Sequence, residues 1–170
     1  MTRLARAARH AGRAAPFLLV AVLVTAPVTV AGQGGTGRPF RGSLGGEVNF
    51  YADWSDPVCP VTTVTDASGL VSHLGAVTTH WTHCPPVVLP GYTDGHLVFT
   101  AANGDTLVGA YEDADGDVPF TIEIVGGTGR FAGAHGSIDV WFETDGPWGE
   151  DGFPINPWPW TAEFDGVISY

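Results

Sequence analysis

The sequence contains no lysine, and its 170 residues carry only seven arginines against eighteen acidic residues. The formal net charge at neutral pH is −11. A surface of this kind repels phosphate backbones, so the composition argues against a nucleic-acid partner. We interpret the acidity as a feature that favours solubility.

The sequence also has no convincing apolar repeat of 3.6 residues after residue 31, which argues against helices. Apolar residues instead alternate with other residues in short segments separated by turn signals about every ten residues. This pattern predicts an all-β domain, and we favour a single antiparallel barrel of about eight strands over a sandwich. The last segment alternates up to the final residue, so we expect it to pair with the first strand and close the barrel. The clearest segments are residues 44–52, 69–79, 96–101, 105–111, 118–125 and 160–170.

The first 31 residues lack acidic side chains altogether and read as an export signal. Four arginines precede an uncharged apolar run over residues 16–31, which ends in small residues. This order is typical of a cleaved signal peptide, and the prolines in the run argue against a membrane-spanning helix. We therefore predict a signal peptide over 1–31, a flexible tether over 32–39 and a barrel domain over 40–170. Cleavage would leave three arginines against eighteen acids, a net charge of −15, and no membrane span.

Only two cysteines are present, Cys59 and Cys84. In an exported protein an even pair is most simply one disulfide, so we predict that they are bonded. The expected location is extracellular.

Three segments resemble a known group of proteins. GGTGRFAGAHG, within residues 126–136, resembles the G-G-T-G-[KR]-F-x-x-A-x-G segment of dirigent proteins and the related corner of allene oxide cyclases. AANGDTLVGAY at 101–111 and SHLGAVT at 72–78 are similar to segments of secreted bacterial proteins described as allene oxide cyclase barrel-like. The resemblance spans residues 40–170 and implies an eight-stranded calycin-like barrel. Plant members of this group cyclise an epoxide or steer radical coupling, and they oligomerise, although nothing in this sequence identifies an interface.

Candidate catalytic residues follow partly from this resemblance. Allene oxide cyclases hold their substrate with a glutamate and an asparagine two residues apart on the first strand, a spacing that Glu47 and Asn49 share here. His73 and His135 lie in the segments that carry the resemblance. Either histidine would be a natural general base if it faced the barrel interior. A structural or surface histidine is the alternative reading for both.

Metal and cofactor signals are weak. His80, Thr82 and Cys84 would share one face of a strand and His83 the other, which leaves too few ligands for zinc once Cys84 is in a disulfide. The acidic run 112–117 lacks the glycine and glutamate positions of a calcium loop, so we read it as a solvated hairpin tip. The glycine-rich letters at 127–132 precede a strand instead of a helix, so no nucleotide site is expected. No metal and no cofactor are predicted.

A rigid segment rich in tryptophan and proline, residues 144–160, contains Trp148, Trp158 and Trp160. It either covers one mouth of the barrel or offers indole rings to a sugar or an apolar ligand. The sequence thus favours a non-catalytic secreted module that binds a small apolar molecule or plays a structural role. The alternatives are an isomerase or cyclase acting on a small apolar substrate in the barrel, and carbohydrate binding through this loop.

Overall fold

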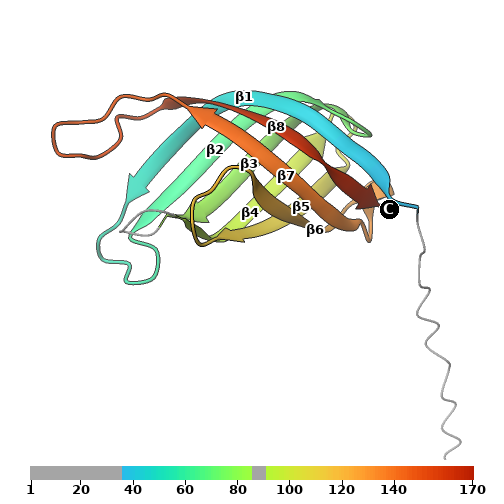
Figure 1. Ribbon diagram of the computed structural model, residues 1–170, viewed down its shortest axis with the longest axis horizontal. Helices are drawn as coiled ribbons and strands as arrows, with labels where there is room; N and C mark the ends of the chain where they lie inside the picture. The colour runs from blue at the N-terminus through green and yellow to red at the C-terminus, as the bar shows by residue number, and fades with distance from the viewer. Residues whose placement is uncertain (1–35, 86–90) are drawn as a thin grey trace, which may run out of the picture. The chain divides into compact units, whose positions relative to one another are not determined.

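The computed structural model describes residues 36–85 and 91–170, and this part of the chain forms an antiparallel β-barrel (Figure 1). The predicted signal peptide, and the tether up to residue 35, lie outside the described residues. The described residues contain no helix long and apolar enough to cross a membrane. The elements are β1 (Arg38–Ala52), β2 (Val61–Val71), β3 (Gly75–Cys84), β4 (Tyr92–Ala101), β5 (Thr106–Asp113), β6 (Phe120–Gly127), the 3-10 helix η1 (Gly129–Phe131), β7 (His135–Thr144) and β8 (Trp158–Ser169).

Each strand pairs with the next along the chain, and β8 pairs with β1 to close the barrel. The closing ladder runs from Arg38 opposite Ile168 to Val48 opposite Trp158. The predicted all-β barrel and the predicted pairing of the last strand with the first are therefore confirmed. Closure pairs β1 with β8, so these two strands do not form the open edges that they would have in a flat sheet.

The alternation in the sequence decides which side chains enter the barrel. Successive strand residues point to opposite faces, so Trp160, Ala162 and Phe164 of β8 are buried while Thr161 and Glu163 are exposed. The same rule operates in every strand, and the inward side chains form one core. The largest fully buried members are Phe40, Phe99, Phe131, Leu97, Leu107, Ile122, Ile138, Ile168 and Val140.

Several local predictions need correction. Residues 69–79 are not one strand, because residues 72–74 form the turn between β2 and β3, where His73 has a φ of 68°. The strand β1 begins at Arg38, two residues inside the segment that the sequence assigns to the tether. The hairpin at Asn103–Gly104 is confirmed, but only Gly104 has a positive φ there. A type I′ turn needs positive φ at both central residues, so the turn is of another type.

The two ends of the barrel differ, and we name them by their connections. The closed end carries the three connections 72–74, 102–105 and 128–134. The first residues of β1 and the last residues of β8 lie there as well. The open end carries the connections 53–60, 114–119 and 145–157. In Figure 1 the 145–157 loop extends beyond the strands at the open end.

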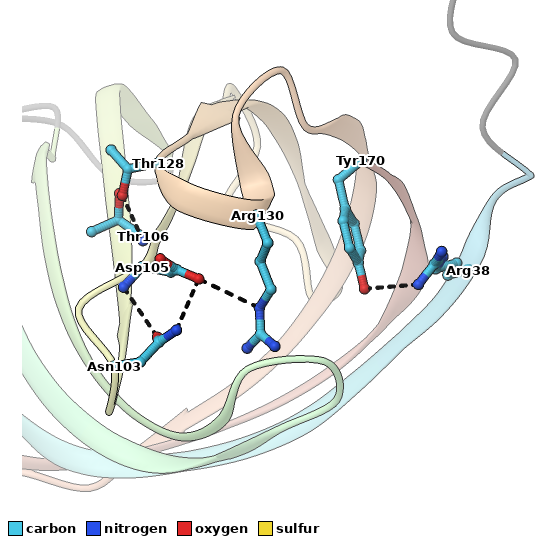
Figure 2. Close-up of polar contacts among 7 residues, drawn as sticks. All are labelled: Arg38, Asn103, Asp105, Thr106, Thr128, Arg130 and Tyr170. Atoms are coloured by element: carbon cyan, nitrogen blue, oxygen red, sulfur yellow. Dashed lines mark hydrogen bonds and ion pairs between the residues drawn. The ribbon is translucent and has the colours of Figure 1, made fainter.

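Paired polar groups surround the closed end (Figure 2). Asn103 Nδ2 donates a hydrogen bond to Asp105 Oδ2 at 2.9 Å, and Arg130 Nε lies 3.6 Å from the same oxygen. Arg38 Nη1 donates to the Tyr170 hydroxyl at 3.1 Å. Gly129 has a φ of 57°, and a side chain there would strike the Asp105 carboxylate, so the glycine-rich corner permits this cluster.

The predicted disulfide is present at the open end. Cys59, in the 53–60 connection, is bonded to Cys84 at the end of β3, with their Cα atoms 5.5 Å apart. The bond closes a loop across a sequence separation of 25 residues, which stabilises the fold by about 3 kcal/mol through the unfolded-state entropy.

Candidate functional site

The open half of the barrel contains an apolar cavity of about 200 Å³. All of its described lining comes from inward positions near the open ends of the strands and from the adjoining loops. No acidic or basic side chain other than a histidine is among the described lining residues. They are Val48, Phe50, Thr63, Thr65, Trp81, His83, Pro85, Tyr92, Tyr111, Phe120, Phe142, Thr144, Trp148, Trp158 and Trp160.

The ladder between β2 and β3 fixes the polar part of the lining. Thr63 lies directly opposite His83, and Thr65 lies directly opposite Trp81. Opposite residues of an antiparallel pair have Cβ atoms roughly 5 Å apart, so the Thr63 hydroxyl and the His83 ring occupy neighbouring places on one wall. This wall is the polar spot of a cavity that is otherwise mostly aromatic.

His83 and Tyr111 form a hydrogen-bonded pair across β3 and β5. His83 Nδ1 lies 2.7 Å from the Tyr111 hydroxyl, and Tyr92 packs on the imidazole with ring centroids 4.4 Å apart. Burial lowers the pKa of His83 to about 4, so the imidazole is neutral at neutral pH. Burial, and to a lesser extent the neighbouring Tyr92, raises the pKa of Tyr111 above its ordinary value. The pair therefore brings two neutral, polar rings to the cavity.

Thr63 is buried with 2% of its surface exposed, and its Oγ1 atom has no hydrogen-bond partner among the described residues. A buried hydroxyl without a partner is costly, at about 1–3 kcal/mol. Thr79 is a buried threonine of the same core, and its hydroxyl accepts a hydrogen bond from the Trp81 indole at 2.9 Å. Thr63 differs from Thr79 in having no such bond. The Thr63 hydroxyl is therefore a buried polar group whose hydrogen-bonding capacity is unused among the described residues.

The 145–157 loop contributes Trp148 to the lining of the cavity and is fastened to the barrel at two points. The side-chain amide of Asn156 exchanges two hydrogen bonds with the backbone of Phe50, at 2.9 and 2.7 Å, as a neighbouring strand would. The Trp158 indole donates to Pro147 O at 3.0 Å. Gly146 lies against the Trp158 ring so closely that a side chain at this position would strike it.

The three tryptophans predicted for ligand contact all line the cavity, but they are not equivalent. Trp158 and Trp160 are buried, whereas Trp148 is 58% exposed at the rim. The rings of Trp148 and Trp158 meet edge to face, with centroids 4.9 Å apart and an interplanar angle of 77°. The three tryptophans therefore do not provide the two exposed, coplanar rings that we require for stacking on a sugar.

Glu47 and Asn49 do not face the cavity. They lie on the outer face of β1, beside a shallow groove that also includes Asp66 and His80. His80 Nδ1 and Asp66 Oδ1 are 2.8 Å apart there, with both side chains largely exposed. The two-residue spacing does place Glu47 and Asn49 on one face, but that face is the solvent side of the barrel.

The other two candidate histidines lie at the closed end, away from the cavity. His73 occupies the turn between β2 and β3, where its Nε2 lies 2.9 Å from Pro39 O and its ring packs on Tyr170. His135 is the exposed first residue of β7, with Nδ1 3.3 Å from Gly133 O. Neither ring lines the cavity, so neither is placed to act on a molecule bound there.

Within residues 36–85 and 91–170, no group of three or more His, Cys, Asp or Glu side chains is placed to hold a metal ion. The acidic run 112–117 spans the end of β5 and the turn toward β6, and its residues are mostly exposed. Asp113 is the exception, since one of its carboxylate oxygens is buried without a partner among the described residues.

Sequence reasoning missed the polar residues that do line the cavity, among them Thr63, His83 and Tyr111. For His83 a signal was available. Val77, Thr79 and Trp81 alternate into the barrel, and continuing this period of two places His83 on the same inward face. The presence of Cys84 next to it drew attention to the outer face instead.

Comparisons with known proteins concern the fold. No family model matches the chain, and no curated protein matches it. Two solved dirigent proteins have similar structures. The pterocarpan synthase dirigent protein GePTS1 is 16% identical with a TM-score of 0.56, over 85% of this chain and 95% of that one. The pterocarpan synthase dirigent protein PsPTS1 is 14% identical with a TM-score of 0.53, over 79% and 95%. The described chain is thus an eight-stranded antiparallel barrel of the kind found in dirigent proteins.

Proposed function

We propose that this protein is a secreted barrel that binds a small apolar molecule in the open-end cavity without transforming it. The observation that carries the proposal is the cavity itself, which is lined mainly by aromatic rings and is bounded by a fastened loop. An engineered apolar cavity of roughly 150 Å³ stays dry and binds benzene. A cavity of about 200 Å³ therefore suits a molecule of one ring or two small rings.

Binding of an apolar molecule is favoured because it removes the apolar surface of the cavity from water. Burying apolar area stabilises a complex by roughly 25 cal/mol per Å² before the costs of association. The nearby acidic residues of the open end, such as Asp145, Glu150 and Asp151, are exposed on the outer loops and do not enter the lining. The site therefore selects by shape and apolar contact.

Native mass spectrometry of the protein purified from culture medium tests this proposal and gives the number of subunits in the same spectrum. We expect an adduct of low mass that is released on denaturation. Thr65→Phe, which places a ring into the cavity from a buried inward position, should abolish the adduct. An adduct that persists unchanged in this variant, or the absence of toluene binding to the emptied wild-type protein, would count against the cavity as a binding site.

An isomerase or cyclase is the second candidate, and one observation favours it. His83 and Tyr111 are neutral, hydrogen-bonded and buried beside the cavity, where a pair of this kind can donate or accept a proton at a bound substrate. The two dirigent structures are described as pterocarpan synthases, which concerns those proteins only. The test is to incubate the bound molecule for a long time with wild-type protein and, as the comparison, with His83→Phe. If the molecule is recovered chemically unchanged from both, this candidate is excluded.

Export is supported by the disulfide between Cys59 and Cys84 and by the signal-like first 31 residues. We expect the protein in the culture medium to begin after Ala31. Intact mass of the secreted chain measures this directly, and retention of the uncleaved chain in the cell membrane would contradict it.

A further inference from the structure

Thr63 and His83 stand side by side on one wall of the cavity, and one polar atom of each has no partner among the described residues. One is Thr63 Oγ1, which is buried and unpaired. The other is Nε2 of His83, since the described bond of this imidazole is made by Nδ1 to Tyr111. Because Thr63 and His83 are direct cross-strand partners, a group bound between them lies close to both side chains. The Thr63 hydroxyl is covered in the free protein, so it meets such a group by turning about the Cα–Cβ bond.

The hydrogen-bond chemistry of Tyr111 fixes what His83 offers. A phenol is a better donor than an imidazole N–H, and a neutral imidazole nitrogen is a better acceptor than a phenol oxygen. The Tyr111 hydroxyl therefore donates to Nδ1, and the proton of the neutral ring sits on Nε2. This tautomer is assigned from the chemistry of the pair, and it leaves Nε2–H as the free donor of a ring that lines the cavity. The opposite tautomer would leave the Tyr111 O–H without an acceptor among the described residues.

We propose that the cavity takes a small apolar carbonyl compound, a ketone, enone or lactone, whose oxygen accepts hydrogen bonds from Thr63 Oγ1–H and His83 Nε2–H. The proposal rests on the cavity being the binding site. A carbonyl oxygen has two lone pairs and no proton, so it satisfies two converging donors and leaves nothing of its own unpaired. The rest of the ligand meets aromatic rings.

Other ligand classes fit this wall less well. A hydrocarbon would leave both donors unpaired in a closed complex. A carboxylate would bring a charge into a cavity whose described lining holds no cation to pair with it, which is strongly unfavourable.

Acetophenone and ethylbenzene are suitable probes, because they have nearly the same shape and differ in the carbonyl group. Headspace gas chromatography over protein solutions at pH 7 gives the binding constant of each volatile probe. Ethylbenzene reports on cavity size and apolar contact, so the comparison between protein variants isolates the hydrogen bonds. A net contribution of roughly 0.7 kcal/mol per hydrogen bond corresponds to about threefold in affinity.

Thr63→Val keeps the shape of the side chain and removes the hydroxyl, and His83→Phe keeps a ring and removes the donor. Each change should weaken acetophenone about threefold, and the double change about tenfold. Ethylbenzene should change by less than twofold in all of them. Thr78→Val is the matched control, since Thr78 is exposed on the outer face of the same strand as His83, and it should alter neither constant.

Thr63→Val also reports on folding. Replacing an unpaired buried hydroxyl with a methyl group should raise the melting temperature of the free protein, so weaker acetophenone binding in this variant cannot come from unfolding. Equal responses of the two probes across the variants would overturn the carbonyl assignment and leave the cavity as a binding site. Failure of both probes to bind the wild-type protein up to their solubility limits would overturn both proposals.

Discussion

The closed and open halves of the barrel are built from the same eight strands, yet one is filled and the other is hollow. In the closed half, Phe40, Phe99 and Phe131 are fully buried and in contact with other core side chains. In the open half, the inward positions of β2 are taken by Thr63 and Thr65, which are short, and aromatic rings stand around the space that they leave. Side-chain volume at a few inward positions therefore decides where a small barrel is hollow.

The connections at the closed end are also more tightly held than those at the open end. At the closed end they are short and hold each other through polar contacts. Thr106 N donates to Thr128 Oγ1 at 2.9 Å (Figure 2). Thr128 N in turn donates to Thr106 O, also at 2.9 Å. At the open end the 145–157 loop is long and is held by its own tryptophans and by Asn156. A filled, tightly connected half can thus carry the stability that a hollow half gives up.

The largest expected effect comes from removing a ring in each half. Phe99→Ala should lower the free energy of unfolding by about 4 kcal/mol, because it opens a cavity in a fully packed region. Phe142→Ala, a partly buried ring that already borders the cavity, should cost about half as much. Urea denaturation measures both values, and equal losses would show that the two halves are packed alike.

Removal of the disulfide should affect the open end first. Cys59→Ala combined with Cys84→Ala should lower the free energy of unfolding by about 3 kcal/mol. Hydrogen exchange should accelerate in the 53–60 connection and at the end of β3, while the amides near Thr106 keep their protection. Uniform acceleration over the whole barrel would show that the two ends open as one unit.

The pH dependence of stability should contain a contribution from His83. Its pKa falls from the ordinary 6.5 to about 4 on folding because of burial, so the unfolded chain binds this proton more readily. Stability should therefore fall as the pH drops from about 6.5 to 4, by about 3 kcal/mol for this group, and should be unaffected by it well above pH 6.5. The titratable groups around the His83 imidazole are Tyr111 and Tyr92, which contact it. The charge of Asp113 acts on Tyr92.

The measurement is the difference in unfolding free energy between wild-type protein and His83→Phe at pH 7 and at pH 4.5. Taking the difference cancels the titration of the carboxylates, which both proteins share. A wild-type advantage that does not shrink toward pH 4.5 would show that the imidazole is not buried in its neutral form.

The smallest expected effect concerns the 145–157 loop at the open end. Asn156→Ala removes both bonds to the Phe50 backbone and should lower the free energy of unfolding by about 1 kcal/mol. Hydrogen exchange at the Phe50 amide should become faster and probe release from the cavity quicker. Asn103→Ala at the closed end breaks the contacts with Asp105 and should leave probe release unchanged, so a change there would contradict the separation of the two ends.

The architecture was accessible from the sequence because a period of two is visible wherever one face of a strand is buried. The alternation of β8, the Asn103–Gly104 hairpin and the glycine corner around Gly129 all led to the correct barrel. The pairing of Cys59 with Cys84 also followed from their number and the expected compartment.

The site was not accessible to the same degree, because local pattern does not reveal which face of a polar strand points inward. Glu47 and Asn49 share a face, but only the pairing of β1 with both neighbours shows that this face is the outer one. His73 looked like a strand residue because it stands in the segment 69–79, which contains several β-branched residues, but its positive φ places it in a turn. The Thr63–His83 wall depends on the register of two strands, which no local pattern in the chain encodes.

The closing ladder also determines where the ends of the domain lie. Arg38 opposes Ile168, and its guanidinium stacks on the Tyr170 ring at 4.7 Å from the centroid. Both ends therefore emerge side by side at the closed end, as Figure 1 shows, and the mouth opens at the other end of the barrel. A short linker could join Arg38 to Tyr170 and new termini could be cut elsewhere, giving a circular permutant. A surface or fusion partner attached next to Arg38 or Tyr170 would leave the cavity free for its ligand.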